Sequence, residues 1–176
     1  ERGDDLELVK IHGIPKIVKT QKDFPFIAVS PQCPTEYVWR DKKMLQAVES
    51  LILKIIKNYR IDKTRVYVTG LSMGGYGTWA LAARRPDFFA AAVPICGGGD
   101  PTTVNVLKNL PIWVFHGGLD GMVLPEESEK MVQALERAGG KVRYTLYPKA
   151  YHDSWTETYD NPELYDWLLS NRKAEN

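Results

Sequence analysis

Short apolar runs alternate with longer segments of helical periodicity along this chain. The apolar runs are typical of strands, and apolar positions that recur three or four residues apart predict helices. The predicted strands are Phe26–Ser30, Arg65–Thr69, Ala91–Ile95, Ile112–His116 and Lys141–Tyr147. The predicted helices are Asp41–Tyr59, Gly75–Arg85, Glu126–Ala138 and Pro162–Asn171. Apolar strands separated by helices predict an α/β fold, a three-layer sandwich around a mostly parallel sheet, in a single domain over residues 1–176.

Composition and charge exclude several function classes. The 176 residues are 44% hydrophobic and 26% charged, with a net charge of +1, which is typical of an ordinary globular domain. Acidic and basic residues are interspersed, so no basic stripe is available to bind nucleic acid. No apolar run approaches the length needed to span a membrane. We therefore expect neither a nucleic-acid partner nor a membrane span.

The two cysteines, Cys33 and Cys96, form neither a disulfide framework nor a metal cluster. Each follows a predicted strand, and at least one further strand is expected between them. This separation favours two free thiols over a disulfide, because a bridge needs Cα atoms within about 7 Å of each other. We expect no metal site.

The most informative motif is Gly70-Leu71-Ser72-Met73-Gly74. It follows a predicted strand and precedes a predicted helix, which is the context of a nucleophile elbow. Such a turn presents the serine hydroxyl above a sheet, and glycines on both sides let strand and helix approach without Cβ clashes. The motif therefore predicts a nucleophilic Ser72. The alternative is a glycine-rich loop with an incidental serine.

A nucleophilic serine needs a base, and the chain offers three histidines. His12 lies in a polar early segment and is expected at the surface. His116 ends a strand before two glycines and is interpreted as structural. His152 lies in a loop after the last predicted strand, where an oriented imidazole is useful. We therefore expect His152 to be the base.

The acid that orients this base is expected to be Asp120, which closely follows a predicted strand. Carboxyl ends of parallel strands meet at one edge of the sheet, where ligand sites gather. Ser72, Asp120 and His152 all lie just beyond such ends, in the chain order of α/β-hydrolases. Asp153 and Asp100 are rival acids.

With these residues placed, the chain resembles the α/β-hydrolase superfamily. More narrowly, it is similar to bacterial carboxylesterases related to feruloyl, acetyl-xylan and polyhydroxybutyrate-depolymerase-like esterases. The segments that carry the resemblance are Ser30-Pro31-Gln32-Cys33-Pro34 with Trp39, Gly70-Leu71-Ser72-Met73-Gly74-Gly75, His116-Gly117-Gly118-Leu119-Asp120 and His152-Asp153-Ser154-Trp155.

The resemblance implies hydrolysis of a small-molecule or glycan-linked acyl ester through a serine-bound acyl intermediate, without a cofactor. Carried over to this sequence, Ser72 is the nucleophile, His152 the general acid and base, and Asp120 its orienting acid. The amide of Met73 is implied to donate to the oxyanion.

The same resemblance implies that Trp39, Gln32 and Trp155 line the substrate mouth. Two of these residues have a structural alternative. Trp155 is equally suited to pack against the terminal helix, and Gln32 to close a turn.

The chain departs from these esterases at its start. Glu1-Arg2-Gly3-Asp4-Asp5 resembles the tail of a loop that supplies a second oxyanion amide, and the strand before that loop is absent. That strand is expected between Phe26–Ser30 and Arg65–Thr69. We therefore expect an N-terminally truncated α/β-hydrolase, a piece of a longer protein. In the alternatives, the two flanking strands pair directly, or another chain, including a second copy in a homo-oligomer, donates a strand.

Three functions stay open at this point. The leading one is a serine carboxylesterase acting on short-chain or aryl acyl esters. The others are a peptidase or amidase of the same fold, and a non-catalytic hydrolase-like domain that binds a glycan or a protein. The compartment is open between secreted and cytoplasmic, and the resemblance favours secretion.

Overall fold

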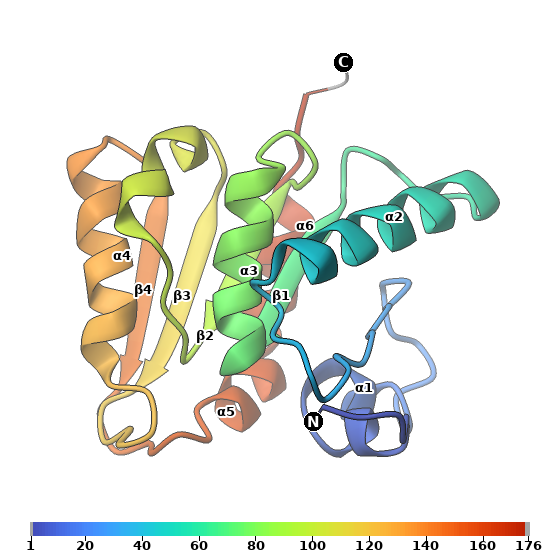
Figure 1. Cartoon of the computed structure of the whole chain (residues 1–176), viewed down its shortest axis with the longest axis horizontal. Helices are drawn as coiled ribbons and strands as arrows, with labels where there is room; N and C mark the ends of the chain where they lie inside the picture. The colour runs from blue at the N-terminus through green and yellow to red at the C-terminus, as the bar shows by residue number, and fades with distance from the viewer. Residues whose placement is uncertain (1, 175–176) are drawn as a thin grey trace.

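The computed structural model describes residues 2–174, so Glu1 of the predicted loop tail lies outside the described part. Its centre is a four-stranded sheet in the order β1-β2-β3-β4 (Figure 1). The strands are β1 (Tyr67–Leu71), β2 (Ala91–Ile95), β3 (Ile112–Gly117) and β4 (Val142–Tyr147). Every neighbouring pair is parallel. All carboxyl ends therefore meet at one edge, as the sequence predicted.

Helices cover both faces of this sheet (Figure 1). The α-helices are α1 (Gly13–Ile17), α2 (Lys42–Asn58), α3 (Met73–Arg84), α4 (Pro125–Arg137), α5 (Trp155–Asp160) and α6 (Pro162–Ser170). Two 3-10 helices, η1 (Leu8–Ile11) and η2 (Pro101–Leu107), complete the elements. The four predicted helices correspond to α2, α3, α4 and α6, whereas α1 and α5 were not predicted. Among the described residues, no helix is both long enough and apolar enough to cross a membrane.

Alternate residues of the strands build two separate cores. On β3, Ile112 and Val114 point to the face covered by α3 and α4, whereas Trp113 and Phe115 point to the face covered by α5 and α6. All four side chains are almost completely buried. This arrangement is the predicted three-layer sandwich, and it explains why the central strands are apolar on both faces along most of their length.

One predicted strand is wrong. The apolar segment Phe26–Ser30 forms no strand, and no backbone hydrogen bond joins residues 26–31 to any described residue. Phe26 packs its ring edge-on against Tyr67 of β1, with 5.7 Å between ring centroids. A strand needs a hydrogen-bonded neighbour, and β1 pairs only with β2 among residues 2–174. Apolar sequence alone cannot supply that neighbour.

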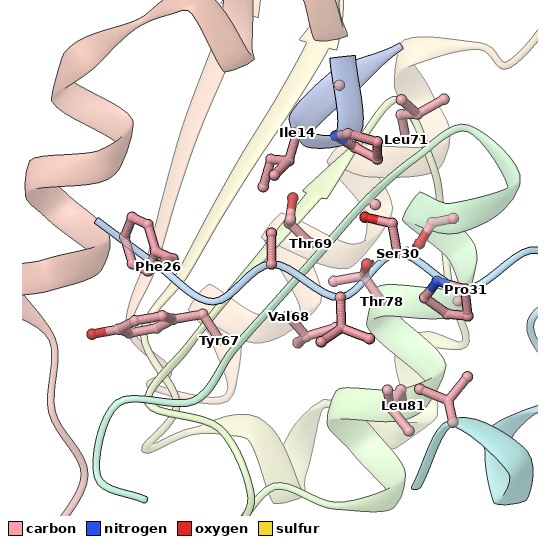
Figure 2. A pocket seen from close by; sticks show the side chains of 18 of the residues that line it. Ile14, Phe26, Ser30, Pro31, Tyr67, Val68, Thr69, Leu71, Thr78 and Leu81 are labelled. Atoms are coloured by element: carbon pink, nitrogen blue, oxygen red, sulfur yellow. Dashed lines mark hydrogen bonds between the residues drawn. The ribbon is translucent and has the colours of Figure 1, made fainter. Parts of the chain in front are cut away.

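A large cavity lies between this segment and β1. Figure 2 shows Phe26, Ser30 and Pro31 beside Tyr67, Val68 and Thr69 of β1. The cavity measures about 1160 Å³, and apolar side chains from α2, α3 and α1 complete its walls. β1 is thus an edge strand within the described part of the chain, with one side of its backbone turned to this space.

Candidate active site

Ser72 lies on the turn between β1 and α3, in the strained conformation that the motif predicted. Its backbone has φ 52° and ψ −116°, a sparsely populated combination for a residue with a side chain. The Ser72 amide donates to the Ile95 carbonyl at 2.9 Å and lies 3.3 Å from Cys96 Sγ. These bonds to the end of β2 hold the turn in place.

The glycines of the motif are not equivalent. A Cβ on Gly70 would come within 2.3 Å of the Gly74 carbonyl oxygen, so strand and helix meet there as expected. A Cβ on Gly74 would meet nothing within 4 Å, so the expectation of crowding on both sides of Ser72 is wrong. The second close approach is at Gly75, where a Cβ would lie 2.4 Å from the Ile95 carbonyl oxygen.

The fold brings Ser72, His152 and Asp120 together from three strand ends. His152 Nε2 lies 2.9 Å from Ser72 Oγ, and His152 Nδ1 lies 2.7 Å from Asp120 Oδ2. The His152 side chain is 14% exposed, whereas that of Asp120 is fully buried. This is the geometry in which an imidazole can take a proton from a serine hydroxyl while a carboxylate orients it.

Hydrogen bonds keep the buried Asp120 ionised. Burial by itself raises the pKa of a carboxyl group. The bonds from His152 and from the amides of Val123 and Met122 outweigh burial, so the pKa of Asp120 lies below its ordinary value. The two amides both donate to Oδ1, at 3.0 and 2.9 Å, which leaves Oδ2 for His152.

The rival acids have other roles. Asp153 is exposed and accepts hydrogen bonds from the amide and hydroxyl of Thr156 in the first turn of α5. Asp100 caps η2 by accepting from the Thr102 amide. Neither residue bonds His152.

The amide of Met73 is free to act on a ligand beside Ser72. Met73 is the first residue of α3, and the first N–H groups of a helix have no partner within it. Ser72 and Met73 both line a second cavity of about 330 Å³. Its other walls are Val38, Trp39, Arg40 and Tyr76.

The three residues predicted at the substrate mouth have different environments in the structure. Trp39 lines both cavities beside Ser72. Trp155 is buried and meets the His152 ring edge-on, with centroids 5.3 Å apart, while it also packs with Leu164 and Leu168 of α6. Gln32 lines neither cavity and donates instead to the Asp5 carbonyl at 2.9 Å.

Cys33 and Cys96 are both buried free thiols, as predicted. Cys96 Sγ lies with ligand atoms of Asp120 and His152 in a group that spans no more than 4.8 Å. The carboxylate and the imidazole already bond each other at 2.7 Å. Burial also raises the pKa of the Cys96 thiol to about 12. The thiolate that a metal needs is thus costly to form here.

Of the two other histidines, His12 differs from its predicted environment. His12 is half-buried rather than exposed and packs against Trp155, with ring centroids 5.5 Å apart. His116 is fully buried, and its Nε2 lies 3.2 Å from Asp120 Oδ2. The spacing His116-x-x-x-Asp120 could have indicated this contact in the sequence, since both residues lie at the same strand end.

Comparison with known proteins places the chain in a family. The model of the Dienelactone hydrolase family matches residues 14–171, which is most of the chain. The chain belongs to the dienelactone hydrolase family. This family assignment agrees with the α/β-hydrolase resemblance seen in the motifs.

Individual relatives of this family member include esterases and a depolymerase. The crystal structure of a thermostable esterase superposes with a TM-score of 0.84 at 39% identity, covering 98% of this chain and 52% of that one. A poly(3-hydroxyalkanoate) depolymerase C of Paucimonas lemoignei is 46% identical over 52 residues, which is 30% of this chain and 13% of that protein. A bifunctional acetylxylan esterase/xylanase of Neocallimastix patriciarum is 30% identical over 107 residues, 59% of this chain and 16% of that protein.

This dienelactone hydrolase family chain thus spans about half the length of the thermostable esterase and a smaller share of the two other relatives. The likeness to that esterase covers the sheet, the helices and the residues around Ser72. It supports the α/β-hydrolase fold for the described chain.

Proposed function

We propose that this chain carries the active site of a serine carboxylesterase that hydrolyses short-chain or aryl acyl esters. The observation that carries the proposal is the hydrogen-bonded series Ser72 Oγ, His152 and Asp120 Oδ2, with distances of 2.9 and 2.7 Å. Membership of the dienelactone hydrolase family supports ester hydrolysis as the reaction class.

In the first half of the reaction, Ser72 Oγ attacks the carbonyl carbon of the ester. His152 Nε2 takes the serine proton, and the ionised Asp120 stabilises the imidazolium that forms. The carbonyl electron pair moves to oxygen, where the Met73 amide donates to the negative charge. One such donor contributes about 10²–10³ in turnover.

The tetrahedral intermediate then collapses. The bond from carbon to the alcohol oxygen breaks, and the alcohol leaves with the proton that His152 held. Next, His152 removes a proton from water, whose oxygen attacks the acyl-serine. The carboxylic acid departs as Ser72 Oγ recovers its proton from His152.

The cavity of about 330 Å³ beside Ser72 supports a small substrate group. This volume is at the low end for ligand pockets. Its aromatic walls, Trp39 and Tyr76, suit a short acyl chain or an aromatic ring.

The test is hydrolysis of p-nitrophenyl acetate and butyrate, with p-nitroacetanilide as the matched amide. We expect turnover of both esters, little of the anilide, and a loss of about 10⁶-fold in kcat for Ser72→Ala. Equal rates for wild type and Ser72→Ala contradict the proposal. A rate on the anilide that matches the acetate points to an amidase instead.

We also infer that the cavity beside β1 takes a β-strand of polypeptide additional to these 176 residues. Residues 26–31 and one side of β1 both line this space, and their backbone groups there have no backbone partners among residues 2–174. An acyl chain would leave those polar groups unsatisfied, whereas a strand satisfies both rows. The thermostable esterase is about twice as long as this chain, so it contains further residues that could form such a strand. We expect a second oxyanion donor to accompany it.

Hydrogen exchange followed by mass spectrometry tests this inference. The probe is a synthetic apolar peptide with alternating Val and Ile and a lysine tail, and a version with prolines in place of alternate residues is the control. We expect the strand peptide alone to slow exchange over Tyr67–Leu71. No protection contradicts the inference. Exchange over Tyr67–Leu71 could instead slow without any peptide as the protein concentration rises. If the protein also has the mass of a dimer, this result assigns the cavity to a second copy.

A further inference from the structure

Asp120 is contacted by two histidines, one on each side. His152 Nδ1 and His116 Nε2 approach the same carboxylate oxygen, Oδ2, at 2.7 and 3.2 Å. His116 comes from the end of β3 and is completely buried, so its contact with Asp120 excludes water. The reaction proposed above uses His152 and leaves His116 without a role.

The neighbours of His116 determine where its protons lie. Nε2 lies 2.9 Å from the Val123 carbonyl oxygen as well as 3.2 Å from Asp120 Oδ2. Both neighbours are acceptors, so Nε2 must carry a hydrogen. This hydrogen is donated to the Val123 carbonyl, and the Asp120 carboxylate lies close beside it.

Ser128 of α4 holds the other side of the ring. Its hydroxyl oxygen lies 2.7 Å from His116 Nδ1 and 2.9 Å from the Gly97 carbonyl oxygen. The hydroxyl has one proton to give. Whether the Ser128 hydroxyl donates to Gly97 or to Nδ1, Nε2 carries the hydrogen that bonds the Val123 carbonyl.

His116 supports Asp120 through Val123 and through a close contact. Oδ1 accepts from the amides of Met122 and Val123, and Oδ2 accepts from His152. His116 Nε2 bonds the Val123 carbonyl and lies 3.2 Å from Oδ2, so it holds the loop whose amide bonds Oδ1. Rotation of the carboxylate would break several of these bonds at once, so its Oδ2 stays aimed at His152.

We propose that His116, held by Ser128, is a positioning residue that fixes Asp120 for proton transfer between Ser72 and His152. The proposal rests on the proposed function, because it is this transfer that the fixed carboxylate serves. The N–H of His116 also disperses the carboxylate charge. Without it, Asp120 Oδ2 becomes a stronger acceptor and holds the charged form of His152 more tightly.

Two substitutions separate the Nε2 contact from the Nδ1 contact. In His116→Gln the amide nitrogen occupies roughly the position of Nε2 and can still donate to the Val123 carbonyl beside Asp120. In His116→Asn the amide nitrogen occupies roughly the position of Nδ1, so the bond to Val123 and the contact with Asp120 are both lost. We expect kcat for p-nitrophenyl acetate to stay within about tenfold of wild type in His116→Gln and to fall about 10²-fold in His116→Asn, with KM little changed.

The acid limb of the kcat/KM profile distinguishes a change in the positioning of Asp120 from a loss of folded protein. Unfolding lowers the rate without moving the limb. The titratable groups that meet at this site beside His116 are Cys96 after β2, Asp120 after β3 and His152 after β4. We expect the acid limb of kcat/KM to move to higher pH in His116→Asn. Ser128→Ala, which leaves His116 in place, should move it in the same direction by less, and serves if His116→Asn does not fold.

Proton NMR without substrate keeps this inference separate from the proposed function. We expect the His152 Nδ1–H resonance to move downfield in His116→Asn and to return toward its wild-type position in His116→Gln. An unmoved resonance and acid limb in both His116→Asn and Ser128→Ala overturn the inference. So does equal impairment of the Gln and Asn variants. Failure of wild type to hydrolyse any ester, with the resonance shift intact, rejects the proposed function alone.

Discussion

Gly70 lies directly against the backbone of Gly74: a Cβ on Gly70 would come within 2.3 Å of the Gly74 carbonyl oxygen, whereas a Cβ on Gly74 would meet open space. The two glycines flank Ser72 symmetrically in the sequence but not in the fold. The first keeps β1 and α3 close, and the second is not required for packing.

We therefore expect opposite effects from the same substitution at these two positions. Gly70→Ala should lower the free energy of unfolding by about 3 kcal/mol, since only backbone displacement can make room. Gly74→Ala should leave it unchanged or raise it by up to about 1 kcal/mol, because alanine favours the helix. Urea denaturation measures both values. Equal destabilisation by the two variants contradicts the asymmetry.

The same substitution at Asp120 and at Asp153 tests which carboxylate orients His152. Asp120→Asn removes the charge that stabilises the His152 imidazolium and favours the wrong tautomer, so kcat should fall by about 10⁴-fold. Asp153→Asn should keep a rate near that of wild type, because asparagine can still accept from the Thr156 amide in the first turn of α5. Ester hydrolysis by the two variants decides between the carboxylates. A larger loss for Asp153→Asn would reverse the assignment.

Activity and folding should respond differently to acid. The hydrogen bonds that hold the pKa of Asp120 below its ordinary value stabilise the fold above the unfolded pKa, and this contribution is lost only as the pH falls through the lowered folded value. At pH 5 it is intact. The base, in contrast, must be neutral, because a protonated His152 cannot accept the Ser72 proton.

We therefore expect hydrolysis to fall reversibly between pH 8 and pH 5 while the far-ultraviolet circular dichroism stays constant. Rates and spectra measured on the same samples test this expectation. A flat rate profile over that range counts against His152 as the base. A simultaneous loss of ellipticity would show that unfolding, and not protonation of His152, removes the activity.

Cys96 should be inert although it lies beside the candidate active site. Burial raises the pKa of its thiol to about 12, so almost none is thiolate at pH 8, and thiolate is the form that alkylates. Iodoacetamide should leave Cys96 of the native protein unmodified and should modify it fully in denaturant. Peptide mapping that finds alkylated Cys96 in native protein contradicts the burial argument.

Much of the site could be predicted because it depends on strand ends. Ser72, Asp120 and His152 each follow an apolar run, and the parallel arrangement brings those ends together whatever the details of packing. The turn at Ser72 could be predicted because a Gly-x-Ser-x-Gly pattern between a strand and a helix is typical of a nucleophile elbow.

The remaining features depend on neighbours that a linear pattern does not contain. Phe26–Ser30 has the composition of a strand, but β1 does not pair with it. Whether Trp155 lines the substrate mouth or packs on the terminal helix could not be chosen from sequence. Its ring packs on His152 and on α6, and it also lines the large cavity. The interpretation of His116 as structural did not include its contact with Asp120, because that contact depends on the strand end and on the geometry of the loop together.

The central claim is that Ser72 is a nucleophile activated by His152. Intact-mass analysis after reaction with a fluorophosphonate probe, followed by peptide mapping, tests it most directly. The account predicts one added probe per chain, located on Ser72, with no addition in Ser72→Ala and strongly slowed addition in His152→Ala. A wild-type protein that stays unlabelled, or a label on any residue other than Ser72, would contradict it.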